Sequence, residues 1–128
     1  RKKTEEKIDD YHIIGSPETL VESLSGGNQQ RASLSLMENE VDLVLLEHPT
    51  RGLDIESSMY MWEKLKERCG LGTSIFFISA DLDEIMRYSD RILVFFSGHV
   101  STPIDASKID RENLGQLIGG KGWGQTFD

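Results

Sequence analysis

The first residues that could do chemistry are an acid and a neighbouring histidine. In the stretch LLEHPTRGLD, Glu47 and His48 directly follow an apolar run, and Asp54 closes a Gly-Leu-Asp turn. A carboxylate at the end of a buried strand is well placed to hold a divalent cation. A zinc site made by Glu47 and His48 is disfavoured, because neighbours on a strand point to opposite faces and no further ligands are evident. His48 could instead cap the strand end by hydrogen bonding, and Asp54 could cap a following helix.

A second group of candidate residues lies at the start of a predicted helix. The stretch LSGGNQQ contains Ser25, Gly26 and Gly27, followed by Asn28 and Gln29. A serine and two glycines entering a helix present several backbone N–H groups and a hydroxyl to one point, and the helix dipole adds to their attraction for an anion. These residues could therefore bind a phosphate. The alternative is a flexible loop in which Ser25 is an ordinary N-cap.

The composition limits the classes of function open to the chain. Its 128 residues make one domain or less, and 38% hydrophobic with 28% charged residues is typical of a globular protein. The formal net charge of −8 disfavours nucleic acid as a partner. The one cysteine, Cys69, excludes an internal disulfide. The first residue is Arg1 rather than methionine, so we expect a piece of a longer chain.

The elements that must position these residues follow from the hydrophobic pattern. Apolar runs predict strands at residues 42–47, 74–79 and 92–96, and a brief fourth strand after a turn at 97–99. Helical spacing and breakers predict helices at 4–11, 26–37, 55–69, 81–88 and 110–118. This alternation indicates an α/β layer with a parallel sheet. Functional residues are then expected at the carboxyl ends of the strands.

Several side chains are expected in the core from their spacing. The helix after Asp54 carries an apolar stripe made of Ile55, Met59, Trp62, Leu65 and Cys69, so Cys69 is predicted to be a core residue rather than a nucleophile. Gly70 is the expected C-cap of that helix. The helix at 81–88 is expected to turn three side chains inward, namely Leu82, Ile85 and Met86. The near-continuous apolar run at 42–47 is typical of a strand covered on both faces.

Three landmarks, in order and at the right spacing, resemble those of ATP-binding cassette ATPases. LSGGNQQR resembles the signature motif in the form typical of sugar and nucleoside importers. LVLLEHPTRGLD resembles the Walker B strand and D-loop, and SIFFISADLDEIMRYSDRILVFFSGHV resembles the switch strand with the helix and strand that follow it. ENLGQLIGGKG is similar to the chain end of the second cassette in such importers.

The resemblance implies a fold and a domain order. The fold would be a partial P-loop NTPase of the RecA-like, layered α/β kind, with a parallel sheet that lacks the P-loop strand and with part of the helical signature subdomain. The order would be a signature-helix region at 1–40, a Walker B, D-loop and switch core at 41–98, and a carboxyl-terminal turn and helix at 99–128. The missing strand should leave an open edge along Ile75 to Ile78, or a gap before residue 92. We expect self-association through that edge, a swapped segment or a local rearrangement.

The matched positions imply a degenerate catalytic site. Glu47 stands where the family has the aspartate that holds the Mg²⁺ shell. His48 stands where the family has the glutamate that polarises the attacking water, and an imidazole brings no negative charge to that position. Ala80 stands where the family has the switch histidine, and an alanine cannot bond a γ-phosphate. The implied site binds nucleotide and turns it over slowly or not at all.

The resemblance also implies cofactors and partners. Residues Ser25 to Gln29 would be offered to ATP, bound with Mg²⁺ on a partner cassette, and Asp54 would lie at the interface between the two cassettes. Membrane permease subunits would be further partners in the import of a simple sugar or nucleoside, at the cytoplasmic face of the cell membrane. Two alternatives stay open, namely an ATPase of this type outside transport and a non-enzymatic interaction module.

One motif is a decoy. Residues 115–121 read GQLIGGK and match the G-x-x-x-x-G-K start of a P-loop. However, Gly122 stands where a Ser or Thr must reach Mg²⁺, and the segment follows a helix rather than a strand. We therefore expect no Walker A motif in this chain, and no ATP hydrolysis by the chain alone.

Overall fold

The structure, a computed structural model, describes residues 1–37 and 41–124 and divides into two compact units, Arg1–Ile78 and Ser79–Asp128. The predicted domain limit at residue 40 and the end of the predicted tail lie outside the described residues. None of the helices in the described ranges combines the length and apolar character that a membrane span needs.

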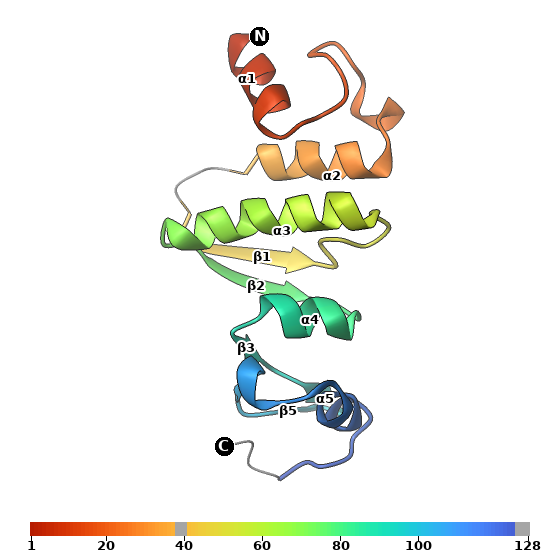
Figure 1. The fold of residues 1–128 in the computed structure, drawn as a ribbon, viewed down its shortest axis with the longest axis vertical. Coiled ribbons are helices and arrows are strands. Elements are labelled where there is room, and N and C mark those ends of the chain that lie inside the picture. The colour runs from red at the N-terminus through yellow and green to blue at the C-terminus, as the bar shows by residue number, and fades with distance from the viewer. Residues whose placement is uncertain (38–40, 125–128) are drawn as a thin grey trace. The chain divides into compact units, whose positions relative to one another are not determined.

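The first unit places helices over a two-stranded parallel sheet. Its elements are α1 (Lys2–Asp10), a 3-10 helix η1 (Val21–Ser23), α2 (Gly26–Ser35), β1 (Leu43–Glu47), α3 (Ile55–Gly70) and β2 (Ser74–Ile78). Figure 1 shows α3 between α2 and the two strands. The predicted helices and strands of this unit are confirmed to within a few residues, whereas η1 was not predicted.

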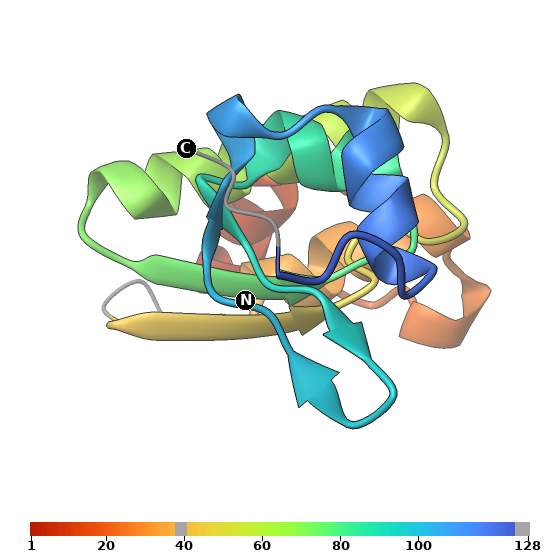
Figure 2. The same cartoon turned by 90° about the horizontal axis from the view of Figure 1, so that it is seen from below.

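The pairing of β1 with β2 is parallel, as the strand-helix-strand order predicts. The register runs from Leu43 opposite Ser74 to Glu47 opposite Ile78, and the two strands lie side by side in both views (Figures 1 and 2). Within the described residues the sheet contains only these two strands, so the outer edge of β2 pairs with no strand there. The expected open edge along Ile75 to Ile78 is therefore present in that part of the chain.

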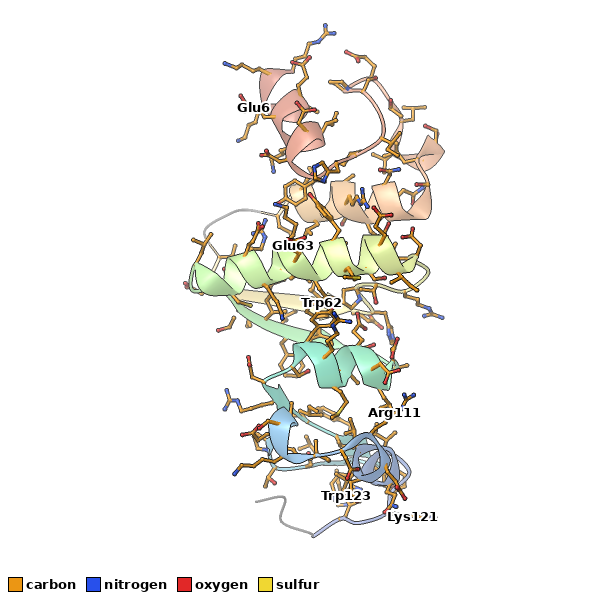
Figure 3. All side chains as sticks on the ribbon, viewed as in Figure 1. Glu6, Trp62, Glu63, Arg111, Lys121 and Trp123 are labelled. Atoms are coloured by element: carbon orange, nitrogen blue, oxygen red, sulfur yellow. The ribbon has the colours of Figure 1, made fainter. Side chains whose placement is uncertain are left out.

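The buried side of α3 is not the stripe that the sequence predicts. Trp62 extends from α3 on the side away from α2 (Figure 3). Its ring packs edge-on against Phe77 with centroids 4.6 Å apart, and Leu65 is fully buried. By contrast Ile55 is 81% exposed, and Met59 and Cys69 are exposed too, so their assignment to the core was wrong. Because α3 is covered by α2 as well as by the strands, its buried residues are Ser57, Met61, Trp62, Leu65 and Arg68, which include only two members of the predicted stripe, Trp62 and Leu65.

The parallel sheet has one covered face and one open face. The open face carries four apolar side chains that are at least 44% exposed, namely Leu43, Leu45, Phe76 and Ile78. Paired residues of parallel strands point to the same side, so these four form one surface. The prediction that strand 42–47 is covered on both faces is therefore wrong for this chain, because α3 covers only one of them.

The end of α3 also differs from the prediction. Gly70 is still the last helical residue, and Leu71 is the C-cap. The left-handed conformation falls on Gly72, with φ +103°, where a glycine is favoured. The helix therefore extends one residue further than predicted, and its cap is Leu71 rather than Gly70.

The second unit has its own apolar core. Its elements are α4 (Leu82–Tyr88), β3 (Arg91–Ile92), β4 (Phe95–Phe96), β5 (His99–Val100), β6 (Ile104–Asp105), a 3-10 helix η2 (Ala106–Lys108) and α5 (Arg111–Ile118). The core consists of Ile92, Val94, Ile104, Ala106, Ile109, Leu114 and Leu117. As predicted, α4 packs against it through its three inward side chains, Leu82, Ile85 and Met86.

The predicted strand at 92–96 is split in two. β3 pairs antiparallel with β6, and β4 pairs antiparallel with β5. Between them the Val94 N–H donates to the hydroxyl of Ser101 at 3.0 Å, so a side chain replaces the next ladder bond. The predicted turn into a fourth strand is confirmed, because Ser97 and Gly98 both have positive φ, as a two-residue hairpin turn requires (Figure 2).

The GQLIGGK decoy is the end of a helix rather than a phosphate loop. Its first four residues form the last turn of α5. A Cβ built on Gly120 would lie 2.3 Å from the Phe96 ring, and φ at this glycine is +80°. The Trp123 indole then donates to the Leu117 carbonyl at 3.0 Å. The glycine at position 120 is thus explained by packing against Phe96.

Candidate functional site

The start of α2 gathers the five residues of the predicted phosphate site. Ser25 is the N-cap, and its Oγ accepts hydrogen bonds from the backbone N–H of Asn28 at 3.4 Å and from its Nδ2 at 2.9 Å. The Gln29 side chain donates back to the Leu24 carbonyl at 3.0 Å. The N-cap role of Ser25 is therefore confirmed. Ser25 and Gly26 are exposed, so the helix N-terminus is open to solvent.

The two glycines of this turn have different surroundings. A Cβ on Gly26 would meet no atom within 4 Å, whereas a Cβ on Gly27 would lie 3.1 Å from the Oγ of Ser57. Ser57 lies in the first turn of α3, so Gly27 is the point at which the starts of α2 and α3 approach each other. Among the described residues no contact explains the glycine at position 26.

The turn before α3 ends in a strong cap. Gly52 adopts φ +77°, and the Asp54 carboxylate accepts hydrogen bonds from the Ser57 backbone N–H at 2.8 Å and from its hydroxyl at 3.0 Å. The predicted N-cap role of Asp54 is confirmed. The bond from the Ser57 backbone, and then that from its hydroxyl, hold the pKa of Asp54 below its ordinary value.

Removing this cap should weaken α3. We expect Asp54→Ala to lower the thermal midpoint of the complete cassette by a few degrees, while Asp54→Asn keeps most of the cap. Because folding lowers the pKa of Asp54, the carboxylate stabilises the fold above its ordinary pKa of 3.8, and this contribution is lost as the pH falls through the folded value. Thermal melts followed by circular dichroism at acid and neutral pH measure both effects. Equal midpoints for Asp54→Ala and the unmodified protein at neutral pH would contradict the prediction.

Glu47 and His48 lie together at the end of β1. Glu47 is exposed on the open face of the sheet, opposite Ile78. The His48 backbone N–H donates to the Ile78 carbonyl at 2.8 Å, which extends the strand pairing by one residue. His48 has φ +47°, a left-handed conformation that histidine adopts more readily than most side chains. Its strand-end hydrogen bond therefore comes from the backbone.

The other predicted position, Ala80, belongs to the second unit. It is exposed and lies between β2 and α4, where the following Asp81 caps α4. Among residues 1–37 and 41–124, no group of three or more His, Cys, Asp or Glu residues could hold a metal ion. Glu47 is thus a single carboxylate, without the ligand set of a complete cation site.

Two residues near this site were not predicted from the sequence. Ser57 is only 7% exposed, and its hydroxyl lies between Gly27 and Asp54. Arg31 extends from the second turn of α2 to that same hydroxyl, with Nη2 at 3.3 Å from Oγ. The role of Ser57 could have been predicted from its position three residues after a capping aspartate. In the first turn of a helix, a side chain at that position can hydrogen-bond back to the capping residue.

Comparison with known proteins identifies the chain's relatives. No protein-family model matches it. It is 35% identical over 121 residues to the guanosine import ATP-binding protein NupO of Bacillus subtilis, and 34% identical over 128 residues to the ribose import ATP-binding protein RbsA of Clostridium perfringens. Each match covers 93% of this chain, but 24% and 25% of the relative. The nucleoside import ATP-binding protein NupA of Lactococcus lactis is 33% identical over 117 residues.

Solved structures agree on the fold. An ATP-binding subunit of an ABC transporter superposes with a TM-score of 0.69 at 17% identity, over 94% of this chain and 49% of the other. An ATP-binding cassette of another ABC transporter gives 0.67 at 18% identity, over 92% and 46%. The chain is homologous to ATP-binding cassette proteins. It has part of the P-loop NTPase fold of these cassettes, and it spans about a quarter of the curated relatives that it matches.

Proposed function

We propose that this cassette homologue is the carboxyl-terminal half of the second nucleotide-binding cassette of an importer for a simple sugar or nucleoside. In this role the α2 N-terminus contacts ATP that is bound on a partner cassette. The observation that carries the proposal is the open start of α2, where a Cβ on Gly26 would meet no atom of residues 1–37 and 41–124 within 4 Å. The relatives named as ribose, guanosine and nucleoside import ATP-binding proteins support the substrate class.

The residues at the start of α2 fit a phosphate group. α2 has ten residues, and its first-turn N–H groups and dipole favour an anion at Ser25 and Gly26. A side chain at position 26 would occupy the space through which a phosphate must approach. The hydroxyl of Ser25 already accepts from Asn28, which leaves its own proton available for an acceptor outside the chain.

The residues at the ends of β1 and β2 fit Mg²⁺ less well than the start of α2 fits a phosphate. Mg²⁺ commonly binds one or two carboxylates together with nucleotide phosphates. Glu47 is exposed and could supply one carboxylate to such a shell, but only beside phosphates that other residues hold. His48 offers no carboxylate at the next position, and the side chain of Ala80 offers no polar atom. We therefore propose that this chain's own nucleotide site is degenerate and that the partner's site carries the hydrolysis.

The proposed partners follow from the same role. The α2 N-terminus and the Asp54 turn face a second cassette, and membrane permease subunits bind the assembled pair. The protein then lies at the cytoplasmic side of the cell membrane as a peripheral subunit. The names of the relatives support this assignment, since all are import ATP-binding proteins.

The isolated 128-residue chain should not hydrolyse ATP above background, because it contains no G-x-x-x-x-G-K-[ST] loop to hold the phosphates. The measurement is phosphate release by the purified chain, alone and after addition of the amino-terminal half of the cassette and its partner cassette. We expect activity only in the reconstituted mixture. Turnover by the purified chain alone would contradict this prediction. If the parts assemble but the mixture is inactive, the result would favour the alternative in which this chain is a non-enzymatic interaction module.

A further inference from the structure

The starts of α2 and α3 are joined by a chain of polar contacts that centres on one buried hydroxyl. The Nη2 of Arg31 donates to the Oγ of Ser57 at 3.3 Å, and that hydroxyl donates to the Oδ2 of Asp54 at 3.0 Å. Ser57 is only 7% exposed. The Arg31 guanidinium, the Ser57 hydroxyl and the Asp54 carboxylate therefore connect the second turn of α2 to the cap of α3. Each group donates to the next along this row.

The guanidinium of Arg31 is fixed from several sides. Its Nη1 donates to the His12 carbonyl at 2.9 Å, and its central carbon lies 4.9 Å from the centre of the Tyr60 ring. The Tyr60 ring in turn contacts the His12 ring, with centroids 5.1 Å apart. An arginine held by a carbonyl, a hydroxyl and an aromatic face has few alternative positions, because its planar fork satisfies all three at once.

The backbone adds a second constraint at the same point. A Cβ on Gly27 would lie 3.1 Å from the Ser57 hydroxyl, so this turn of α2 lies directly against Ser57. The residues just before it, Ser25 and Gly26, are those proposed to reach ATP on the partner. Ser57 therefore contacts the α2 turn on one side and the Asp54 cap on the other.

We propose that Ser57 and Arg31 are positioning residues, which hold the α2 N-terminus and the Asp54 turn at a fixed spacing so that both meet the partner cassette as one rigid surface. The inference rests on the proposed function, since it concerns the presentation of Ser25 and Gly26 to ATP. Neither residue touches the nucleotide. Each acts through the placement of groups that do.

The test of this proposal is a substitution that removes the Ser57 hydroxyl and leaves the Asp54 cap of α3 in place. In Ser57→Ala the backbone N–H of residue 57 still donates to Asp54, so α3 keeps its N-cap. In the complete ATPase we expect kcat to fall about 10-fold, with KM for ATP changed less than about twofold. The reason is that the Ser57 hydroxyl loses its hydrogen bonds to two charged groups, the Arg31 guanidinium and the Asp54 carboxylate, while the nucleotide's own cradle is intact. Arg31→Lys should give a similar loss, since a single ammonium cannot reach both His12 and Ser57.

A matched control lies next in the chain. The Ser58 hydroxyl donates to the Asp54 carbonyl at 2.9 Å, within its own helix, and has no bond to α2. Ser58→Ala should therefore leave kcat within about twofold of the unmodified enzyme, by the usual size of a surface substitution. A loss for Ser58→Ala as large as that for Ser57→Ala would overturn the positioning role.

A double-mutant cycle separates positioning from loss of folded protein. If Ser57 acts through Ser25, the loss caused by Ser57→Ala should shrink to about twofold or less in a Ser25→Ala background. A change in the amount of folded enzyme would multiply kcat by the same factor in both backgrounds, and that result would overturn the inference.

The inference and the proposed function can fail separately. If Ser25→Arg leaves ATP hydrolysis intact, the proposed function is wrong and the inference falls with it. If Ser25→Arg abolishes hydrolysis while Ser57→Ala behaves like Ser58→Ala, the proposed function stands and the positioning role is wrong.

Discussion

Replacing Ser25 with arginine in the complete ATPase should lower kcat for ATP hydrolysis by about 100-fold or more, the size of effect seen when one preorganised donor to a reacting anion is lost. The reason is steric as well as electrostatic. Ser25 is exposed at the open start of α2, so the arginine would extend into the space through which we propose that the phosphate approaches. Phosphate release at saturating ATP measures kcat, and ATP binding is measured alongside it.

A second substitution at the same turn should leave the fold unchanged. Gly26→Asp places a negative charge at the α2 N-terminus, where its Cβ meets nothing within the chain. It is a cleaner test than Gly27→Asp, whose Cβ would lie 3.1 Å from Ser57 and would also disturb packing. We expect Gly26→Asp to abolish hydrolysis with the thermal midpoint unchanged.

The control for both substitutions is His48→Ala. His48 bonds the strand through its backbone, which an alanine retains, and it stands where we propose that no chemistry takes place. The change should alter kcat by a few-fold at most. A loss as severe as that from Ser25→Arg would show that His48 is catalytic and that the degenerate-site proposal is wrong.

The second large effect concerns the open face of the sheet. In the complete cassette, Leu45→Ala should lower the free energy of unfolding by about 2–5 kcal/mol, because we expect the rest of the cassette to cover this face. In the isolated chain the same change should cost less than about 1 kcal/mol, since Leu45 is 71% exposed there. Leu65→Ala is the matched control, and it should cost about 2–5 kcal/mol in both contexts because Leu65 is fully buried within the first unit.

The isolated chain should also self-associate. An apolar face beside an unpaired strand edge is a template for another chain, so we expect dimers or larger species at micromolar concentrations by sedimentation. Replacing Leu45 and Phe76 with lysine should return the chain to a monomer. An unmodified chain that stays monomeric would contradict this expectation. If Leu45→Ala lowers the free energy of unfolding equally in the complete cassette and in the isolated chain, the rest of the cassette does not cover this face.

The sequence predicts the parallel pair and its crossover well, because these depend on local patterns. The apolar runs end near Glu47 and Ile78, and the capping aspartate at position 54 marks the start of α3. The buried side of α3 could not be predicted in the same way. The helix α3 is covered by α2 on one side and by the strands on the other, so it has no single apolar stripe that faces the core. Searching for one stripe therefore led to Ile55 and Met59, which are exposed, and missed buried residues such as Ser57 and Arg68.

The split of the strand at 92–96 was missed for a different reason. Its residues all favour strands, and nothing in them indicates that the Val94 N–H would donate to the Ser101 hydroxyl rather than to a backbone carbonyl. The same applies to the candidate site. Ser25 and Asp54 follow capping rules that can be read from sequence, whereas the contact of Arg31 with Ser57 joins residues from different helices and depends on how those helices pack.

The close approach of Gly27 to Ser57 also has an evolutionary consequence. The two positions share one small volume, so a larger side chain at either can be accommodated only if the other stays small. Positions 27 and 57 should therefore covary among homologues. A homologue with a larger side chain at position 57 should tolerate only glycine at position 27. Within the described residues Gly26 has no such internal neighbour, so we expect its variation among homologues to be independent of position 57.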